Sequence, residues 1–134
     1  MRVSHIIAAA ALLLAATVSA RAAADDPGTK FEKFCSEWMQ KLAVRERDNI
    51  KNIHWVPDGN GVEGEYVGYS SEHTCKLNDN GGGKAPVVGK IIYREYRYMK
   101  KGSSPDSAQT SAPQAVEATE VTEIFRYAKG KWEY

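Results

Sequence analysis

The sequence predicts an α+β fold in which one N-terminal amphipathic helix packs on a four- to five-stranded antiparallel sheet. A segment with the helical spacing of apolar residues comes first, and several segments with alternating spacing follow it. The turns between the alternating segments are too short for crossover helices, so successive strands are expected to pair antiparallel. The helix must then bury its apolar stripe against one face of that sheet.

The chain opens with the pattern of a secretory signal peptide over residues 1–20. Arg2 precedes an uncharged run rich in Ala and Leu, and residues 18–20 (Val-Ser-Ala) supply the small side chains that a signal peptidase needs. The apolar run is shorter than the roughly 20 residues of a membrane-spanning helix. We expect cleavage after residue 20, with Ala22 and Ala24 as alternative sites, and a mature protein without a membrane span in the periplasm or outside the cell.

Cleavage leaves a chain of about 110 residues, a length typical of one domain. We expect a flexible arm over 21–28 and a single α+β domain over 29–134. Of the 18 basic residues only Arg2 precedes the cleavage site, so 17 remain to balance 17 acidic ones. A nucleic-acid-binding protein is not expected, because it would show a strong basic excess.

Cys35 and Cys75 are the two cysteines of the chain. Two cysteines in an oxidising compartment most simply form one disulfide, and their wide spacing differs from the Cys-x-x-Cys of a redox pair. Closing a loop of roughly 40 residues is worth about 4 kcal/mol in the chain-entropy account of disulfide stability. We therefore expect a structural bridge between Cys35 and Cys75.

The helix is predicted over about residues 30–50. Thr29 and Glu32 have the spacing of a capping box, in which Thr29 caps the helix and Glu32 reaches back to its backbone amide. One continuous apolar stripe with helical spacing is formed by Phe31, Phe34, Cys35, Trp38, Met39 and Leu42. Because Cys35 lies in this stripe, a bridge to Cys75 would pin the helix onto the sheet.

A Pro-Asp-Gly-Asn-Gly turn at 57–61 ends the helical region, and alternating segments follow it. Strands are predicted over 63–71, over 73–77 as a second strand or a continuation, and over 87–99, 116–128 and 131–134.

Two connections and one irregularity are also predicted. The alternation of 87–99 slips after Tyr93, and a β-bulge or bend near Arg94 would repair it. A flexible turn is expected at 78–83. Residues 101–114 are rich in Gly, Ser, Pro, Ala and Gln, which predicts a mobile low-complexity loop.

One helix followed by antiparallel strands is similar to the element order of cystatin-like folds and, more loosely, of the cone-shaped NTF2-like folds. The similarity lies in the element order alone. The Gln-x-Val-x-Gly hairpin with which cystatins plug cysteine proteases is missing from the sequence. The resemblance therefore implies a fold and carries over no functional residue.

Aromatic and basic side chains interleave over residues 93–98. Such a strand could stack sugar rings or bases, with arginines supplying cation–π contacts, or it could simply pack tyrosines on one face and expose arginines on the other. The loops at 57–62 and 78–84 are further candidate contact surfaces. The candidate binding residues of the strand are Tyr93, Arg94, Tyr96, Arg97 and Tyr98.

His73 and Cys75 are two apart on a predicted strand, so their side chains point the same way. Together with His54 and Cys35 they could supply the four ligands of a tetrahedral metal site. That alternative depends on free thiolates, which a disulfide would remove. We expect no metal and no cofactor.

No catalytic constellation stands out: the sequence has no Gly-x-Ser-x-Gly, no phosphate-binding glycine loop and no His-Glu-x-x-His. We therefore expect a small exported, disulfide-stapled binding or accessory domain rather than an enzyme. Its partner would be a protein, a small molecule or a glycan, and its oligomeric state stays open. The alternative from another class is a helix-on-sheet cone with a small-ligand pocket, in which His54 and His73 would be the acid–base groups.

Overall fold

The computed structural model describes residues 26–78 and 85–134. The predicted signal peptide, the arm before residue 26 and the turn predicted at 78–83, apart from Asn78, lie outside these residues. The elements are α2 (Pro27–Lys51), β1 (Val56–Asp58), β2 (Gly61–Asn78), β3 (Val88–Gly102), α3 (Pro105–Thr110), β4 (Gln114–Ala128) and β5 (Lys131–Glu133).

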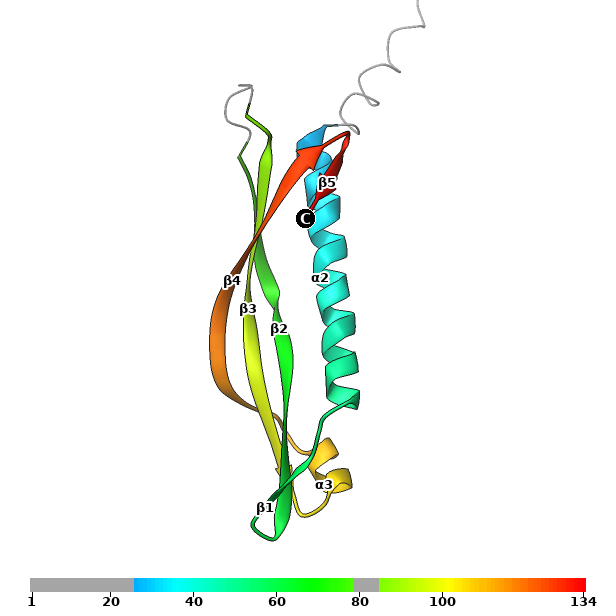
Figure 1. Ribbon diagram of the computed structural model, residues 1–134, viewed down its shortest axis with the longest axis vertical. Coiled ribbons are helices and arrows are strands. Elements are labelled where there is room, and N and C mark those ends of the chain that lie inside the picture. The colour runs from blue at the N-terminus through cyan, green and yellow to red at the C-terminus, as the bar shows by residue number, and fades with distance from the viewer. Residues whose placement is uncertain (1–25, 79–84) are drawn as a thin grey trace, which may run out of the picture.

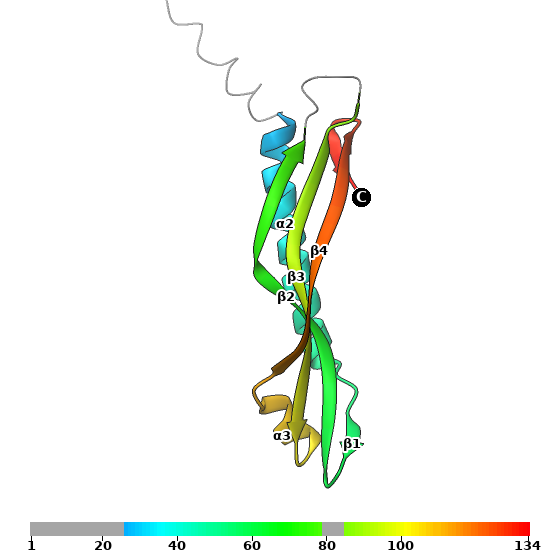
Figure 2. The same cartoon turned by 90° about the vertical axis from the view of Figure 1, so that its left-hand side faces the viewer.

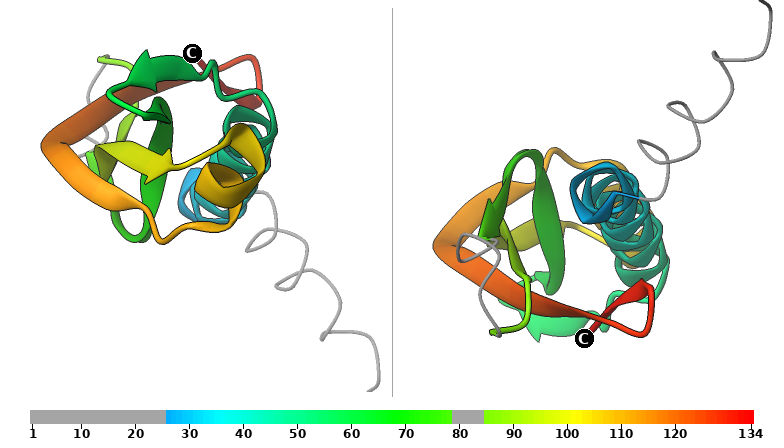
Figure 3. Two further views of the ribbon diagram at one scale, coloured as in Figure 1. Left: turned by 90° about the horizontal axis from the view of Figure 1, so that it is seen from below. Right: turned by 90° about the horizontal axis from the view of Figure 1, so that it is seen from above.

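The five strands form one antiparallel sheet in the order β1-β2-β3-β4-β5, so every strand pairs with its neighbours along the chain. Helix α2 lies along one side of this long sheet (Figure 1), and β2, β3 and β4 twist strongly along their length (Figure 2). Viewed along the long axis, the strands curve around one side of α2 (Figure 3). The fold is α+β, as predicted. Within the described ranges, no helix combines the length and apolarity needed to cross a membrane.

Helix α2 begins earlier than the sequence predicts. Its N-cap is Asp26, whose carboxylate accepts hydrogen bonds from the backbone amides of Gly28 (3.1 Å) and Thr29 (3.4 Å). Pro27 occupies the first turn, where its missing N–H needs no partner. The predicted capping box of Thr29 and Glu32, and the arm extending to residue 28, are therefore wrong. Aspartate is the stronger cap, and it already bonds the Thr29 amide.

The predicted apolar stripe of α2 builds the core. The ring of Phe31 lies directly against Gly89 of β3, where any Cβ would collide with it. Burial of each large apolar side chain contributes about 1.5–3 kcal/mol. The buried cluster contains Phe31, Cys35 and Leu42 of α2 together with Ile91, Tyr93, Phe125 and Trp132 of the strands.

The predicted slip in the alternation of β3 is present. Its buried positions change parity between Tyr93 and Lys100. The register between β2 and β3 shifts between Tyr69 and His73, opposite Arg94. The irregularity is therefore near Arg94, as predicted, with its extra residues on β2. The two segments predicted at 63–71 and 73–77 are one strand, so the continuation is the correct alternative.

Residues 101–114 do not form the unstructured loop that the composition predicts. They contain the end of β3, the short helix α3 and the first residue of β4. Ser104 caps α3, and its side chain and backbone exchange hydrogen bonds with Ser107 in a capping box. Gln109 donates to the backbone carbonyl of Ile50 (3.1 Å), which attaches α3 to the end of α2. The small polar residues that suggested low complexity are the caps of this helix.

Candidate functional site

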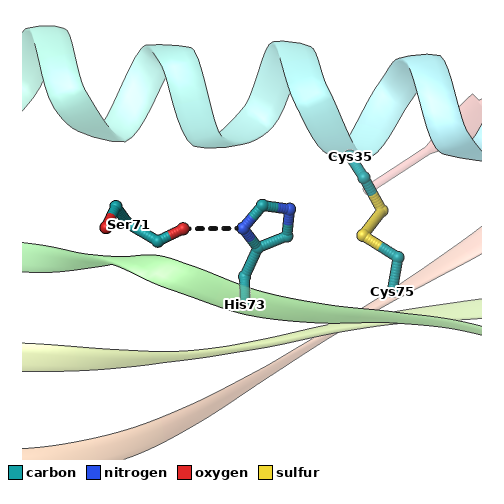
Figure 4. The surroundings of a disulfide bond; sticks show 4 residues. All are labelled: Cys35, Ser71, His73 and Cys75. Atoms are coloured by element: carbon teal, nitrogen blue, oxygen red, sulfur yellow. Dashed lines mark hydrogen bonds between the residues drawn. A yellow bond between two sulfur atoms is a disulfide. The ribbon is translucent and has the colours of Figure 1, made fainter.

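Cys35 and Cys75 form the predicted disulfide, with their Cα atoms 6.5 Å apart. Cys35 is 2% exposed in the core, whereas Cys75 lies at the surface of β2. The bridge spans from the core face of α2 to β2, as Figure 4 shows. It fixes the distance between helix and strand at one point.

A groove of about 510 Å³ lies between α2 and β2, next to the disulfide. This volume is within the usual range for small-ligand sites. All of its lining residues come from α2 and β2, so it opens at the margin of the sheet where β2 lies. Its walls include Cys35, Ser36, Met39, Ala43 and Glu46 on α2 and Tyr69, His73 and Cys75 on β2.

The groove stays open because α2 presents small side chains toward it. Ser36 and Ala43 are exposed, although each directly follows a core residue, Cys35 or Leu42. Neither side chain is long enough to fill the space above β2. His73 and Cys75 on the opposite wall are consequently exposed. An apolar floor of helix and disulfide therefore faces solvent.

At one end of the groove, two side chains of α2 bond the backbone of β2. The carboxylate of Glu46 accepts a hydrogen bond from the amide of Tyr69 (3.5 Å). The amide group of Asn49 donates to the carbonyl of Val67 (2.9 Å). Gly68 provides the room for this arrangement, because a Cβ there would collide with the Glu46 carboxylate. The helix thus lies directly beside the margin of β2.

A stack of tyrosines borders Glu46. The rings of Tyr66 and Tyr98 are 5.1 Å apart, and those of Tyr96 and Tyr98 are 5.5 Å apart. Burial, and after it the negative charge of Glu46, raises the pKa of Tyr66 and the pKa of Tyr98 above the ordinary value. Both phenols are therefore uncharged at neutral pH.

The side chains of the predicted binding strand 93–98 lie in different surroundings. Tyr93 is buried in the core, and its hydroxyl donates to the carboxylate of Glu123 (3.2 Å). Arg97 is exposed and bonds Glu65 (2.7 Å) and Glu117 (3.0 Å). These two residues of the strand therefore belong to different environments.

The other three candidates of that strand divide in the same way. Tyr96 and Tyr98 lie together in the tyrosine stack beside the groove. Arg94 is exposed, and its backbone amide donates to the hydroxyl of Ser70 (2.9 Å) at the register shift. None of these five residues lines the groove, and Tyr98 approaches it as a neighbour of Glu46.

The two histidines considered as acid–base groups are apart. His73 lines the groove, and its Nδ1 lies 2.9 Å from the Ser71 carbonyl oxygen (Figure 4). His54 is exposed in the connection between α2 and β1 and does not line the groove. With Cys35 and Cys75 bonded to each other, the thiolates of the four-ligand metal alternative are gone. Among residues 26–78 and 85–134, no three potential ligands are grouped to hold a metal ion.

The sequence interpretation missed Ala43 and Glu46 as residues of the site. The sequence contains a signal for Ala43. Ser36 and Ala43 are seven residues apart and therefore lie on the same face of the helix. Two small residues on that face, beside the apolar stripe, mark where the helix cannot fill the space over a strand.

No protein-family model matches the chain, and neither the curated proteins nor the solved structures that were compared with it include a match.

Proposed function

We propose that the protein is a small exported, disulfide-stapled domain that works by binding, and that the groove between α2 and β2 is its binding site. The observation that carries the proposal is the groove itself. Met39, Ala43 and Tyr69 supply apolar walls, with Glu46 and His73 as polar groups at its margins. A concave, mainly apolar surface with a few placed polar groups is the usual form of a ligand site.

Export is supported by the disulfide, because such bonds persist in oxidising compartments. The signal-peptide pattern over 1–20 agrees with that location. In this proposal the segment 29–134, together with the first turn of α2, is one domain. The disulfide has a second role here, since it holds α2 at a fixed height above β2. A groove with fixed walls loses less conformational entropy when a ligand enters it.

The sequence also suggested a small-ligand pocket in which two histidines act as acid–base groups. The pocket is supported, but the pair of acid–base groups is not. His73 lies in the groove, but the second proposed acid–base group, His54, lies elsewhere. A single histidine whose ring meets a backbone carbonyl is suited to orienting a ligand. We therefore propose a binding role for His73.

The proposal is tested by titrating Nile red, a neutral apolar dye, into the mature protein and three variants. Ala43→Trp places an indole in the groove, and it does so from an exposed position of α2. Val44→Trp is the matched control, because Val44 is 47% exposed on the same helix and does not line the groove. His73→Ala tests the polar margin.

Wild type and Val44→Trp are expected to enhance the dye's fluorescence with equal affinity. Ala43→Trp is expected to weaken binding by about tenfold or more, which corresponds to about 1.4 kcal/mol. Equal binding by Ala43→Trp and wild type, with both proteins folded by circular dichroism, would rule out the groove as the binding site.

A further inference from the structure

We propose that the occupant of the groove is an extended peptide segment of another protein, which adds to the free edge of β2 and places a lysine or arginine side chain against Glu46. The inference rests on the proposed function and names the chemical class of its ligand. Three observations support it: an open strand edge, a carboxylate without a basic partner, and an apolar wall facing both.

The open edge follows from the sheet topology. β1 pairs with β2 only at residues 61–63, and β3 occupies the opposite side of β2. Over residues 64–77, the remaining edge of β2 therefore pairs with no strand of the described chain. An unpaired edge presents backbone donors and acceptors that an incoming extended chain can bond.

Only part of that edge is available. Near the Glu46 end, the side chains of Asn49 and Glu46 already bond the backbone of Val67 and Tyr69. Beyond the register shift, residues 73–77 are exposed. The shift thus divides the edge into a part closed by the helix and a part open to an added strand. A strand that pairs with 73–77 would extend over the groove toward Glu46.

The negative charge of the groove indicates a partner with a basic side chain. The lining residues include two carboxylates, Glu32 and Glu46, and no lysine or arginine. Glu46 is half-buried, and no ion pair found in the described residues involves it. The described ion pairs instead use carboxylates such as Glu65 and Glu117, which lie outside the groove.

A cation is the complementary group for such a carboxylate. A partly desolvated carboxylate gains more from a charge-assisted hydrogen bond than an exposed one does. The neighbouring phenols of Tyr66 and Tyr98 are uncharged, and their ring faces also attract cations. Between the two ends, Met39 and Ala43 offer apolar surface to the alternate side chains of an added strand.

The test uses the full mature protein and three synthetic probes. The first is acetyl-Thr-Val-Thr-Val-Lys-Val-amide, and the other two carry norleucine or glutamate in place of lysine. Affinities are measured by calorimetry at low salt for wild type, for Glu46→Gln and for Glu37→Gln. Glu37 is the matched control, since it is an exposed carboxylate of α2 outside the groove.

Wild type and Glu37→Gln are expected to prefer the lysine peptide over the norleucine peptide by about tenfold. Glu46→Gln is expected to bind both peptides equally, at the affinity of the norleucine peptide for wild type. Hydrogen exchange of the amides in 73–77 is expected to slow when the lysine peptide saturates the protein. Glutamate in the peptide is expected to weaken binding below that of norleucine.

The outcomes separate the inference from the function on which it rests. If wild type binds Nile red in the groove but shows no preference for lysine, the inference is wrong and the binding site stands. A preference that survives in Glu46→Gln also overturns it. A homodimer in native mass spectrometry that the lysine peptide does not dissociate would assign the edge to a second copy. Failure of both dye and peptides to bind would remove the proposed function itself.

Discussion

The carboxylate of Glu46 on α2 accepts a hydrogen bond from the backbone amide of Tyr69 on β2, at 3.5 Å. Tyr69 lies on the edge of β2, and at this point no other described strand pairs with that edge. A helix side chain therefore closes one part of the edge and leaves the following part, beyond the register shift, exposed. The same carboxylate supplies negative charge to the end of the groove.

Gly68 is predicted to be required for the position of Glu46. In Gly68→Ala, the new methyl group would collide with the Glu46 carboxylate and the Tyr98 ring. We expect the free energy of unfolding to fall by about 1–3 kcal/mol, as for other overpacked sites. Urea denaturation measures the change.

A double-mutant cycle identifies the source of this cost. Glu46→Ala removes one of the two colliding groups, so Gly68→Ala should cost less in that background than in wild type. An identical cost in both backgrounds would mean that the carboxylate does not occupy the space above Gly68.

The disulfide is predicted to hold the helix and the groove together. Replacing Cys35 and Cys75 by serine should lower the free energy of unfolding by about 3–4 kcal/mol in the chain-entropy account. Nile red affinity should fall as well, because α2 is no longer held above β2. Val44→Ala is the control, since Val44 is exposed and lies outside the groove, and it should change neither quantity appreciably. Unchanged dye binding in the serine variant would show that the bridge does not shape the groove.

Because Tyr93 is buried, the protein is expected to lose stability in alkaline solution. Burial, with Glu123 as the second cause, raises the pKa of Tyr93 above the value of about 10 expected in the unfolded chain. As the pH rises, the Tyr93 hydroxyl therefore loses its proton in the unfolded chain before it does so in the folded protein. The free energy of unfolding is undiminished below a pH of about 10 and declines above it. Urea denaturation across the alkaline range measures this decline.

Two tyrosine-to-phenylalanine variants isolate that contribution. Tyr93→Phe should be about 1–2 kcal/mol less stable at neutral pH, because the hydrogen bond to Glu123 is lost. Its stability should also decline less steeply with alkaline pH. Tyr134→Phe, at a position that is 81% exposed, should retain the decline of wild type. Identical alkaline profiles for Tyr93→Phe and wild type would refute the assignment.

The proposed export predicts a specific intact mass. Protein purified from an exported fraction should begin at Arg21 and carry the mass of one disulfide rather than two free thiols. Denaturing mass spectrometry gives both results at once. A chain that still begins at Met1, or one that reacts with a thiol reagent before reduction, would contradict the expectation.

The sequence predicted those features that depend on periodicity. The apolar stripe of α2 contains the residues that are buried, and the paired cysteines are bonded. The slip after Tyr93 also appeared at the predicted place. Because such a slip changes which face later residues point to, it could have indicated that the tyrosines and arginines of 93–98 do not share one surface.

Features that depend on competition between local signals or on long-range packing were missed. Asp26 caps the helix in place of Thr29, because its carboxylate accepts from the amides of Gly28 and Thr29 and so Thr29 already lies inside the first turn. Helix α3 arises from a serine capping box inside a segment whose composition resembles a loop. The groove has walls from α2 and β2, and its opening depends on how far Ala43 falls short of the strand. The spacing of Ser36 and Ala43 indicates which face of the helix is short of side chains, but no local pattern encodes that distance.

The most direct test of the binding groove is an NMR titration of the isotope-labelled mature protein with the lysine peptide. The account predicts the largest amide shift changes at Ser36, Ala43, Tyr69 and His73, on the two walls of the groove. Shift changes centred on Arg94 and Arg97, with the groove residues unchanged, would contradict it and would return the binding site to the exposed arginines of β3.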